Sequence, residues 1–263
     1  MALAPVVDHV GGTTSWTEAG DGSPVVFLHG LGGTRSSWGP QLRGLCDQFR
    51  CIAWDMPGYG DSEPVEDLTY ATIADRLVAL FDELGLAKPD LVGLSFGGMH
   101  ALHTAIRHPD RVGRLVLADS SPAFGMDGTT VDDWTRDRLQ PTDNGYTPAD
   151  IAESVIDAIT ARQLTGQIRH ETIEAFGKIS PAGFRAAVEC LPKNDVRDEL
   201  GSILHETLII VGELDQETPV QYAQVLSDGL PNAELTILDG VGHLSPAEDP
   251  DRFNASVRRF LET

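Results

Sequence analysis

Six short apolar runs, separated by amphipathic helical patterns, constrain the fold of this chain more than any other feature. Several of the runs are apolar throughout, as strands that are covered on both faces must be. Strands that alternate with helices predict an α/β fold with a parallel sheet. The predicted strands are Val25–Leu28, Cys51–Trp54, Leu91–Leu94, Arg114–Ala118, Thr207–Val211 and Glu234–Leu238.

Two further segments near the N-terminus extend this pattern. Residues Val6–Val10 and Thr13–Trp16 are short and are separated by Gly11 and Gly12. This arrangement predicts an antiparallel hairpin that leads into the sheet. We therefore expect a mostly parallel, eight-stranded sheet flanked by helices.

The alternation of strands and helices stops after Arg114–Ala118, which is the sixth strand when the two hairpin strands are counted. Between residues 121 and 204 the sequence has helical patterns at Val131–Leu139, Ile151–Leu164 and Pro181–Leu191, and it has no convincing strand. An insertion at this point predicts a lid over the carboxyl ends of the strands, where open α/β sheets place their active sites. We expect a core of residues 1–120 and 205–263 and a helical lid at residues 121–204.

The strongest signal for chemistry is the pentapeptide GLSFG at residues 93–97, which fits the pattern G-x-S-x-G. A predicted strand precedes it and a helical pattern follows it, which is the context of a nucleophile elbow. In such a turn the hydroxyl of Ser95 stands above the sheet, at the N-terminus of a helix. The alternative is a glycine-rich turn with an incidental serine, and we favour a nucleophile.

A glycine-rich segment, HGLGG at residues 29–33, follows the first parallel strand directly. Acyl transfer needs two hydrogen-bond donors directed at the oxyanion, and glycines let a backbone approach the substrate closely. We expect these donors to be the backbone N–H groups of Leu31 and of Phe96, the residue after the serine. His29 is expected to hold the loop by hydrogen bonds.

A serine hydroxyl needs a base such as imidazole before it can attack a carbonyl. His243 follows the last predicted strand and lies near the C-terminus, which makes it the candidate base. Two acids could orient this histidine, because each follows a predicted strand: Asp215 after Thr207–Val211 and Asp119 after Arg114–Ala118. We favour Asp215, and Asp119 stays open as the alternative.

These blocks together resemble the α/β-hydrolase superfamily, including the chain order serine, acid, histidine. The resemblance covers nearly the whole chain except the predicted lid. Within the superfamily the sequence is most similar to 3-oxoadipate enol-lactonases and related esterases, whereas Ser95 replaces the aspartate nucleophile of haloalkane dehalogenases and epoxide hydrolases. The matching blocks are His29–Gly33, Asp55–Ser62, Gly93–Met99, Arg107–Val112, Leu191–Leu200, Gly212–Pro219 and Val241–Pro250.

The resemblance implies an α/β-hydrolase fold and a serine hydrolase that cleaves a carboxylic ester or a lactone, with an enol-lactone among the candidates. Such acyl transfer needs no metal and no organic cofactor. Two other functions stay open: hydrolysis of a carbon–carbon bond in products of aromatic degradation, and ligand reception without catalysis. The side chains that we expect in the substrate pocket are Trp38, Phe124, Trp134 and Arg185.

The net charge of -21 bears on possible partners. A surface this acidic repels nucleic acid and anionic membranes, so we expect a small-molecule substrate and neither of those partners. The three cysteines, odd in number and without CxxC spacing, predict free thiols in a reducing compartment. The first residues, Met1–Pro5, show no leader pattern, and we expect a cytoplasmic protein. The oligomeric state is left open.

Overall fold

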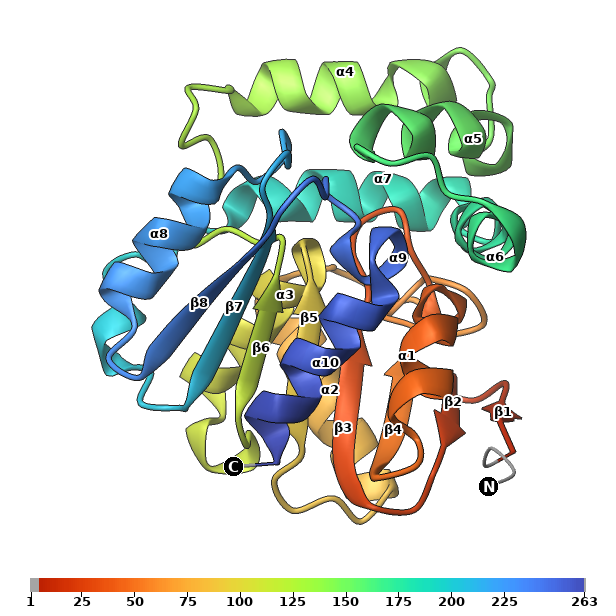
Figure 1. Cartoon of the computed structure of the whole chain (residues 1–263). Helices are drawn as coiled ribbons and strands as arrows, with labels where there is room; N and C mark the ends of the chain where they lie inside the picture. Colours follow the sequence, from red (N-terminus) through yellow and green to blue (C-terminus); the bar gives the residue numbers. More distant parts are fainter. Residues whose placement is uncertain (1–4, 263) are drawn as a thin grey trace.

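The parallel sheet expected from the apolar runs is present in the computed structural model, which describes residues 5–262 (Figure 1). Its strand order is β1-β2-β4-β3-β5-β6-β7-β8. Strand β2 is antiparallel to both of its neighbours, and the remaining pairs are parallel, which confirms the predicted sheet. The strands are β1 (Val7–His9), β2 (Trp16–Ala19), β3 (Ser23–Leu28), β4 (Phe49–Trp54), β5 (Asp90–Leu94), β6 (Leu115–Ala118), β7 (Thr207–Gly212) and β8 (Ala233–Leu238).

Helices cover both faces of this sheet and its upper edge in Figure 1. Within the described residues the α-helices are α1 (Gly39–Leu45), α2 (Tyr70–Glu83), α3 (Phe96–Arg107), α4 (Val131–Asp143), α5 (Pro148–Ile159), α6 (Gly166–Gly177), α7 (Pro181–Cys190), α8 (Val220–Gly229), α9 (Ser245–Glu248) and α10 (Pro250–Leu261). Short 3₁₀ helices lie at Arg35–Trp38, Pro109–Arg111, Leu191–Lys193 and Leu200–Ser202.

Two apolar layers, one on each face of the sheet, explain why the central strands are apolar at every position. In β3, Val26 and Leu28 pack into the layer that contains α2, α3 and α8. Val25 and Phe27 alternate with them and pack into the layer that contains α1 and α10. All four side chains are buried, as expected for a strand covered on both faces.

Several element boundaries differ from the sequence expectation, among them those of the second hairpin strand and of helix α5. The second hairpin strand is Trp16–Ala19 and not Thr13–Trp16, because its polar residues pair with β4 as well as with β1. Helix α5 ends at Ile159, five residues before the predicted end. The backbone N–H groups of Ala161 and Arg162, which would continue the helix, donate instead to the carboxylate of Glu248.

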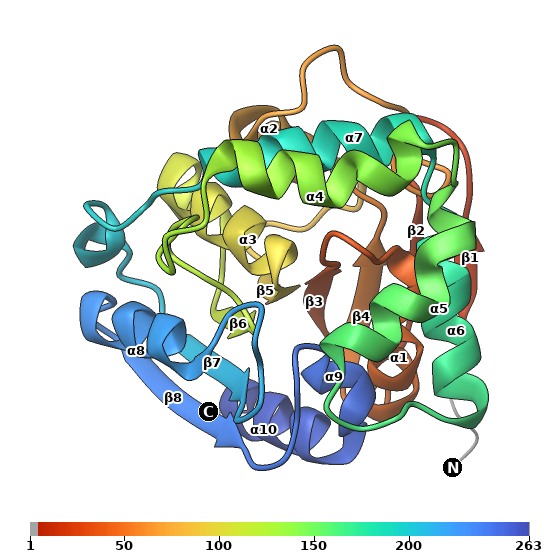
Figure 2. The ribbon, with the colours of Figure 1, turned by 90° about the horizontal axis from the view of Figure 1, so that it is seen from above.

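Helices α4 to α7 come between β6 and β7 and lie above the carboxyl ends of the strands (Figure 1). Seen from above in Figure 2, α4 and α7 lie side by side and α5 runs from them toward α9. Helix α6 was not among the predicted helices. It buries only Thr172, Ala175 and Phe176, which is too few apolar positions to give a clear helical period.

Among residues 5–262, no helix has the length and apolar character that a membrane crossing requires. Cys46, Cys51 and Cys190 are buried and unpaired, which agrees with the prediction of free thiols. Residues 1–4, from which the absence of a leader was predicted, lie outside the described residues. The cytoplasmic location stays a prediction.

Candidate active site

The loops that follow five strands of the sheet carry every residue that was predicted to act in catalysis. These strands are mutually parallel, so their carboxyl ends meet at the same edge of the sheet. Leu31 follows β3, Ser95 and Phe96 follow β5, Asp119 follows β6, Asp215 follows β7 and His243 follows β8.

Ser95 occupies a sharp turn between β5 and α3. Its backbone has φ 53° and ψ -115°, a left-handed conformation that is uncommon for a residue other than glycine. Small neighbours are required here, since a Cβ atom on Gly97 would collide with the carbonyl of Leu28, and one on Gly93 would collide with the backbone of Gly97. The turn has the form of a nucleophile elbow, as its sequence predicts.

The side chains of Ser95 and His243 are in hydrogen-bond contact although they lie 148 residues apart in the chain. The distance from Ser95 Oγ to His243 Nε2 is 3.0 Å. The loop that carries His243 is fixed by its own backbone, whose N–H donates to the carbonyl of Ile159 at 3.1 Å. The ring is buried, which limits the positions that it can adopt.

Asp215 contacts the opposite side of the same imidazole ring. Its two carboxylate oxygens lie 2.9 and 3.0 Å from His243 Nδ1. The carboxylate also accepts the backbone N–H groups of Glu217 and Thr218, at 2.8 and 3.0 Å, and the Thr218 hydroxyl at 2.8 Å. These three donors fix its orientation, so that a continuous chain of contacts runs from Asp215 through His243 to Ser95.

The charges of this buried pair stabilise each other. Burial by itself lowers the pKa of His243, but the charge and hydrogen bond of Asp215, with smaller contributions from the charges of Asp119 and Glu217, together outweigh it and raise the pKa to about 9. Burial likewise acts to raise the pKa of Asp215. The positive charge of His243 and the hydrogen bonds from its ring and from Thr218 reverse this effect, so the pKa is lowered. The site therefore favours an imidazolium beside a carboxylate, which is the state of a histidine that has accepted a proton.

Asp119, the alternative acid, is fully buried but lies against backbone instead of the imidazole. Its carboxylate accepts the N–H of Gly212 at 2.9 Å and the N–H of Ser245 at 3.1 Å. Among residues 5–262 its carboxylate has no hydrogen bond to His243. Burial, followed by the charge of Asp215, raises its pKa to about 8. Asp119 thus ties together the two backbone segments that carry Asp215 and His243.

The glycine-rich loop after β3 lies against the serine. A Cβ atom on Gly30 would stand 3.4 Å from the Cβ atom of Ser95. The N–H of Leu31 belongs to an irregular segment and that of Phe96 is the first in α3, and neither has an acceptor within residues 5–262. Both groups are therefore free to bind a developing oxyanion.

His29 holds this loop in place, as its position in the sequence indicates. Its Nδ1 is 2.9 Å from the carbonyl oxygen of Gly30, and its Nε2 accepts the N–H of Met56 at 3.1 Å. Burial lowers the pKa of His29, so the ring is a neutral hydrogen-bonding bridge. The hydroxyl of Tyr59 donates to the carbonyl of Leu31 at 3.0 Å and fixes the far side of the loop.

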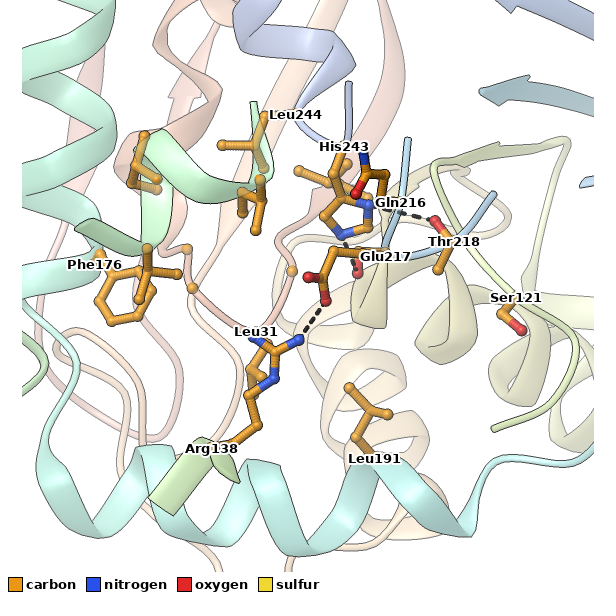
Figure 3. Close-up of a pocket in the computed structure, with 18 of the residues that line it drawn as sticks. Leu31, Ser121, Arg138, Phe176, Leu191, Gln216, Glu217, Thr218, His243 and Leu244 are labelled. Carbon is orange, nitrogen blue, oxygen red and sulfur yellow. Dashed lines mark hydrogen bonds and ion pairs between the residues drawn. The ribbon is translucent and has the colours of Figure 1, made fainter. Parts of the chain in front are cut away.

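A cavity of about 520 Å³ opens between these loops and helices α4 to α7, and Ser95 and His243 form part of its wall. Three of the four predicted pocket residues, Trp38, Phe124 and Trp134, line it. Arg185 differs from the expectation, because it lies outside the lining and its guanidinium pairs with Asp143 and Glu189. Figure 3 shows Phe176 and Leu244 on one side of His243 and Ser121 on the other.

Sequence reasoning missed several residues of this site. Glu217 was not among the predicted site residues, but it lines the cavity and pairs with Arg138 of α4 (Figure 3). Thr218, a donor to Asp215, has no motif of its own. The one available signal was their position, within three residues of an acid that follows a strand.

Glu248 links the end of α5 to the loop that carries His243. Its Oε2 accepts the N–H groups of Ala161, Arg162 and Gly242 at 2.9, 3.0 and 3.0 Å. Its Oε1 accepts the N–H of Leu244 at 3.1 Å. One carboxylate therefore holds two segments that are about 80 residues apart in the sequence.

The fold and the loop geometry together define an α/β hydrolase, and residues 25–256 match the model of the alpha/beta hydrolase family. The chain belongs to this family. It is 32% identical to a 2-hydroxymuconate semialdehyde hydrolase of Pseudomonas putida, over 94% of this chain and 90% of the relative. It is 27% identical to 3-oxoadipate enol-lactonase 1 of Acinetobacter baylyi, over 91% and 88%. A solved thermophilic esterase from Thermogutta terrifontis superposes with a TM-score of 0.83 at 27% identity, and the match covers 98% of both chains.

Proposed function

We propose that this protein is a serine hydrolase that cleaves a carboxylic ester or a lactone through an acyl-enzyme. The observation that carries the proposal is the chain of contacts Ser95 Oγ–His243 Nε2–Asp215, at 3.0 and 2.9 Å, in the wall of a cavity. The similarity to an enol-lactonase and to a solved esterase supports the same reaction class.

The first step forms the acyl-enzyme. His243 Nε2 takes the proton of the Ser95 hydroxyl while Oγ attacks the carbonyl carbon, and Asp215 stabilises the resulting imidazolium. The N–H groups of Leu31 and Phe96 bind the oxyanion. As the tetrahedral intermediate collapses, the bond to the leaving oxygen breaks and His243 returns its proton to the alcohol or enol.

The second step releases the acid. A water molecule enters the position of the departed alcohol. Neutral His243 removes a proton from this water while the water oxygen attacks the acyl carbon. The second tetrahedral intermediate breaks the bond to Ser95 Oγ, which recovers its proton from His243. The chain itself supplies every proton carrier and every oxyanion donor that the two steps use.

The helices between β6 and β7 have a role in this proposal. Residues 121–204 act as a lid, with residues 1–120 and 205–263 as the core. Helices α4 to α7 lie over the strand ends, and residues of all four line the cavity, among them Trp134, Ile156, Phe176 and Phe184. An apolar cover of this kind excludes bulk water and strengthens the electrostatic interactions inside.

A second candidate function is carbon–carbon bond hydrolysis, which the 32% identity to a 2-hydroxymuconate semialdehyde hydrolase favours. The two functions make different demands, since a carbon–carbon hydrolase acts on a ketone and has to protonate a leaving carbanion at carbon, whereas an esterase protonates a leaving oxygen. A receptor without catalysis would retain the contacts of Ser95 but turn over nothing.

The test is hydrolysis of p-nitrophenyl acetate and butyrate by the wild type and by Ser95→Ala. We expect turnover in the wild type and a loss on the order of 10⁴–10⁶ in the variant, because the covalent step disappears. A Ser95→Ala protein that keeps most of its activity would contradict the mechanism. Negligible turnover by both proteins would instead favour the carbon–carbon hydrolase or the receptor.

A further inference from the structure

An ion pair that the proposed hydrolysis does not use faces the cavity. Arg138 of α4 and Glu217 of the loop after β7 are 79 residues apart in the sequence, and their side chains meet beside His243 (Figure 3). Both residues line the cavity, and about a third of each side chain is exposed. A third contact holds the arginine, because its guanidinium carbon lies 4.6 Å from the centre of the Trp134 ring.

The charged groups around the cavity are mostly acidic. Asp127, Asp137 and Glu217 line it, and Arg138 is the sole lysine or arginine in the lining within the described part of the chain. The charge of that arginine is already neutralised by Glu217. Arg185, which was expected in the pocket, lies outside the lining and pairs with Asp143.

This charge pattern matters for the binding of an anion. A carboxylate that leaves water for an apolar cavity loses its hydration, and this loss has to be offset by a paired cation. Here Arg138 pairs with Glu217 and protonated His243 pairs with Asp215, so neither cation of the lining is free for an anion. Of the other two acids, Asp137 pairs with Arg136, and the charge of Asp127 repels an anion. An uncharged substrate has no such cost and gains contact with the apolar wall, which includes Trp38, Phe176 and Leu244.

We propose that Glu217 sets the charge selectivity of the cavity by holding Arg138, so that the protein takes an uncharged ester or lactone. A substrate that retains a carboxylate, such as a lactone of a dicarboxylic acid, is disfavoured. This inference rests on the proposed hydrolase function and narrows its substrate class. The preference should then reverse when the Glu217 charge is removed, because this leaves the guanidinium of Arg138 unpaired beside His243.

The test compares two esters that differ in one terminal group. Ethyl pentanoate ends in a methyl group and monoethyl glutarate ends in a carboxylate, and the chain length and the leaving group are the same. Values of kcat/KM are measured for both by acid release in a pH-stat, and the ratio of the two is the readout. We expect the wild type to favour ethyl pentanoate by at least about tenfold.

Glu217→Gln retains the size of the side chain and removes its charge. We expect it to shift the ratio toward monoethyl glutarate by about tenfold or more, which is the range for a hydrogen bond to a charged group. Arg138→Gln in the same background should return the ratio to the wild-type side. Arg185→Gln is the matched control, because it removes an ion pair between α7 and α4 that lies outside the cavity lining, and it should leave the ratio unchanged.

A wild type that favours monoethyl glutarate, or a ratio that Glu217→Gln leaves unchanged, would overturn the proposal. Failure of the hydrolase function would look different, since neither ester would be turned over by any variant. In that case the dissociation constants of the same two esters, measured calorimetrically in Ser95→Ala with and without Glu217→Gln, decide the question. A shifted binding ratio supports the charge selectivity, and an unshifted ratio refutes it.

Discussion

Of the two acids near His243, we expect Asp215 to matter far more for turnover, so that Asp215→Asn loses much more kcat/KM than Asp119→Asn. The carboxylate oxygens of Asp215 lie 2.9 and 3.0 Å from His243 Nδ1, whereas those of Asp119 accept hydrogen bonds from backbone N–H groups. In Asp215→Asn an amide NH₂ can face Nδ1, which favours the tautomer with its proton on Nε2. That tautomer cannot accept the proton of Ser95.

The magnitude follows from the burial of the pair. An imidazolium left without its buried partner is destabilised by about 3–5 kcal/mol. At 1.36 kcal/mol for each factor of ten, this predicts a loss of roughly 10²–10⁴ in kcat/KM for Asp215→Asn. Asp119→Asn should cost less than about tenfold at pH 7. Asp119 has no hydrogen bond to the ring among the described residues, so its replacement leaves the contact between Asp215 and His243 in place.

The assay is p-nitrophenyl butyrate hydrolysis between pH 5 and pH 10. Only neutral His243 can act as the base, so wild-type kcat/KM should rise with pH through the raised pKa of about 9. In Asp215→Asn the lost charge lowers the pKa of His243, and the rise should occur at lower pH with a smaller plateau. The reasoning is refuted if Asp119→Asn loses as much activity as Asp215→Asn, or if the profile of Asp215→Asn does not move.

Two predictions concern stability. The pKa of Asp119 is raised in the folded state, so its contribution to the free energy of unfolding is fully present below about pH 4 and is lost as pH rises toward 8. The melting temperature of Asp119→Asn minus that of the wild type should therefore increase as the pH rises from 4 to 8. A difference that stays constant over this range would contradict a raised pKa for Asp119. Glu248→Gln replaces one of two accepting oxygens by a donor that faces backbone N–H groups, and urea titration should show a loss of about 1–3 kcal/mol. An unchanged midpoint would show that the carboxylate does not hold the two segments together.

The strands could be predicted because both faces of the sheet are covered. A strand such as β3 must then be apolar at successive positions, which is visible in the sequence alone. The second hairpin strand was displaced by three residues, since Thr17 and Glu18 give it no apolar pattern. Helix α6 could not be predicted because it buries few apolar positions, and one of them, Phe176, packs against the distant loop at Gly32.

The catalytic residues of the site could be predicted because each of them comes directly after a predicted strand. Ser95, Asp215 and His243 each lie in a loop at a strand end, and parallel strands bring those loops together. The partner of Glu217 could not be predicted in this way. Arg138 is in a helix, has the sequence context of a surface charge, and meets Glu217 only because α4 lies over the strand ends.

The carboxylate of Glu248 has a consequence for how such proteins can be recombined. It joins the backbone at Ala161 and Arg162 to the backbone on either side of His243. In a chimera, both segments should therefore come from the same parent protein. A chimera that takes its whole helical segment from another hydrolase would separate the base from its support. Crossover points that retain residues 159–162 of this chain would keep that support, which makes the helices before them the exchangeable part of the molecule.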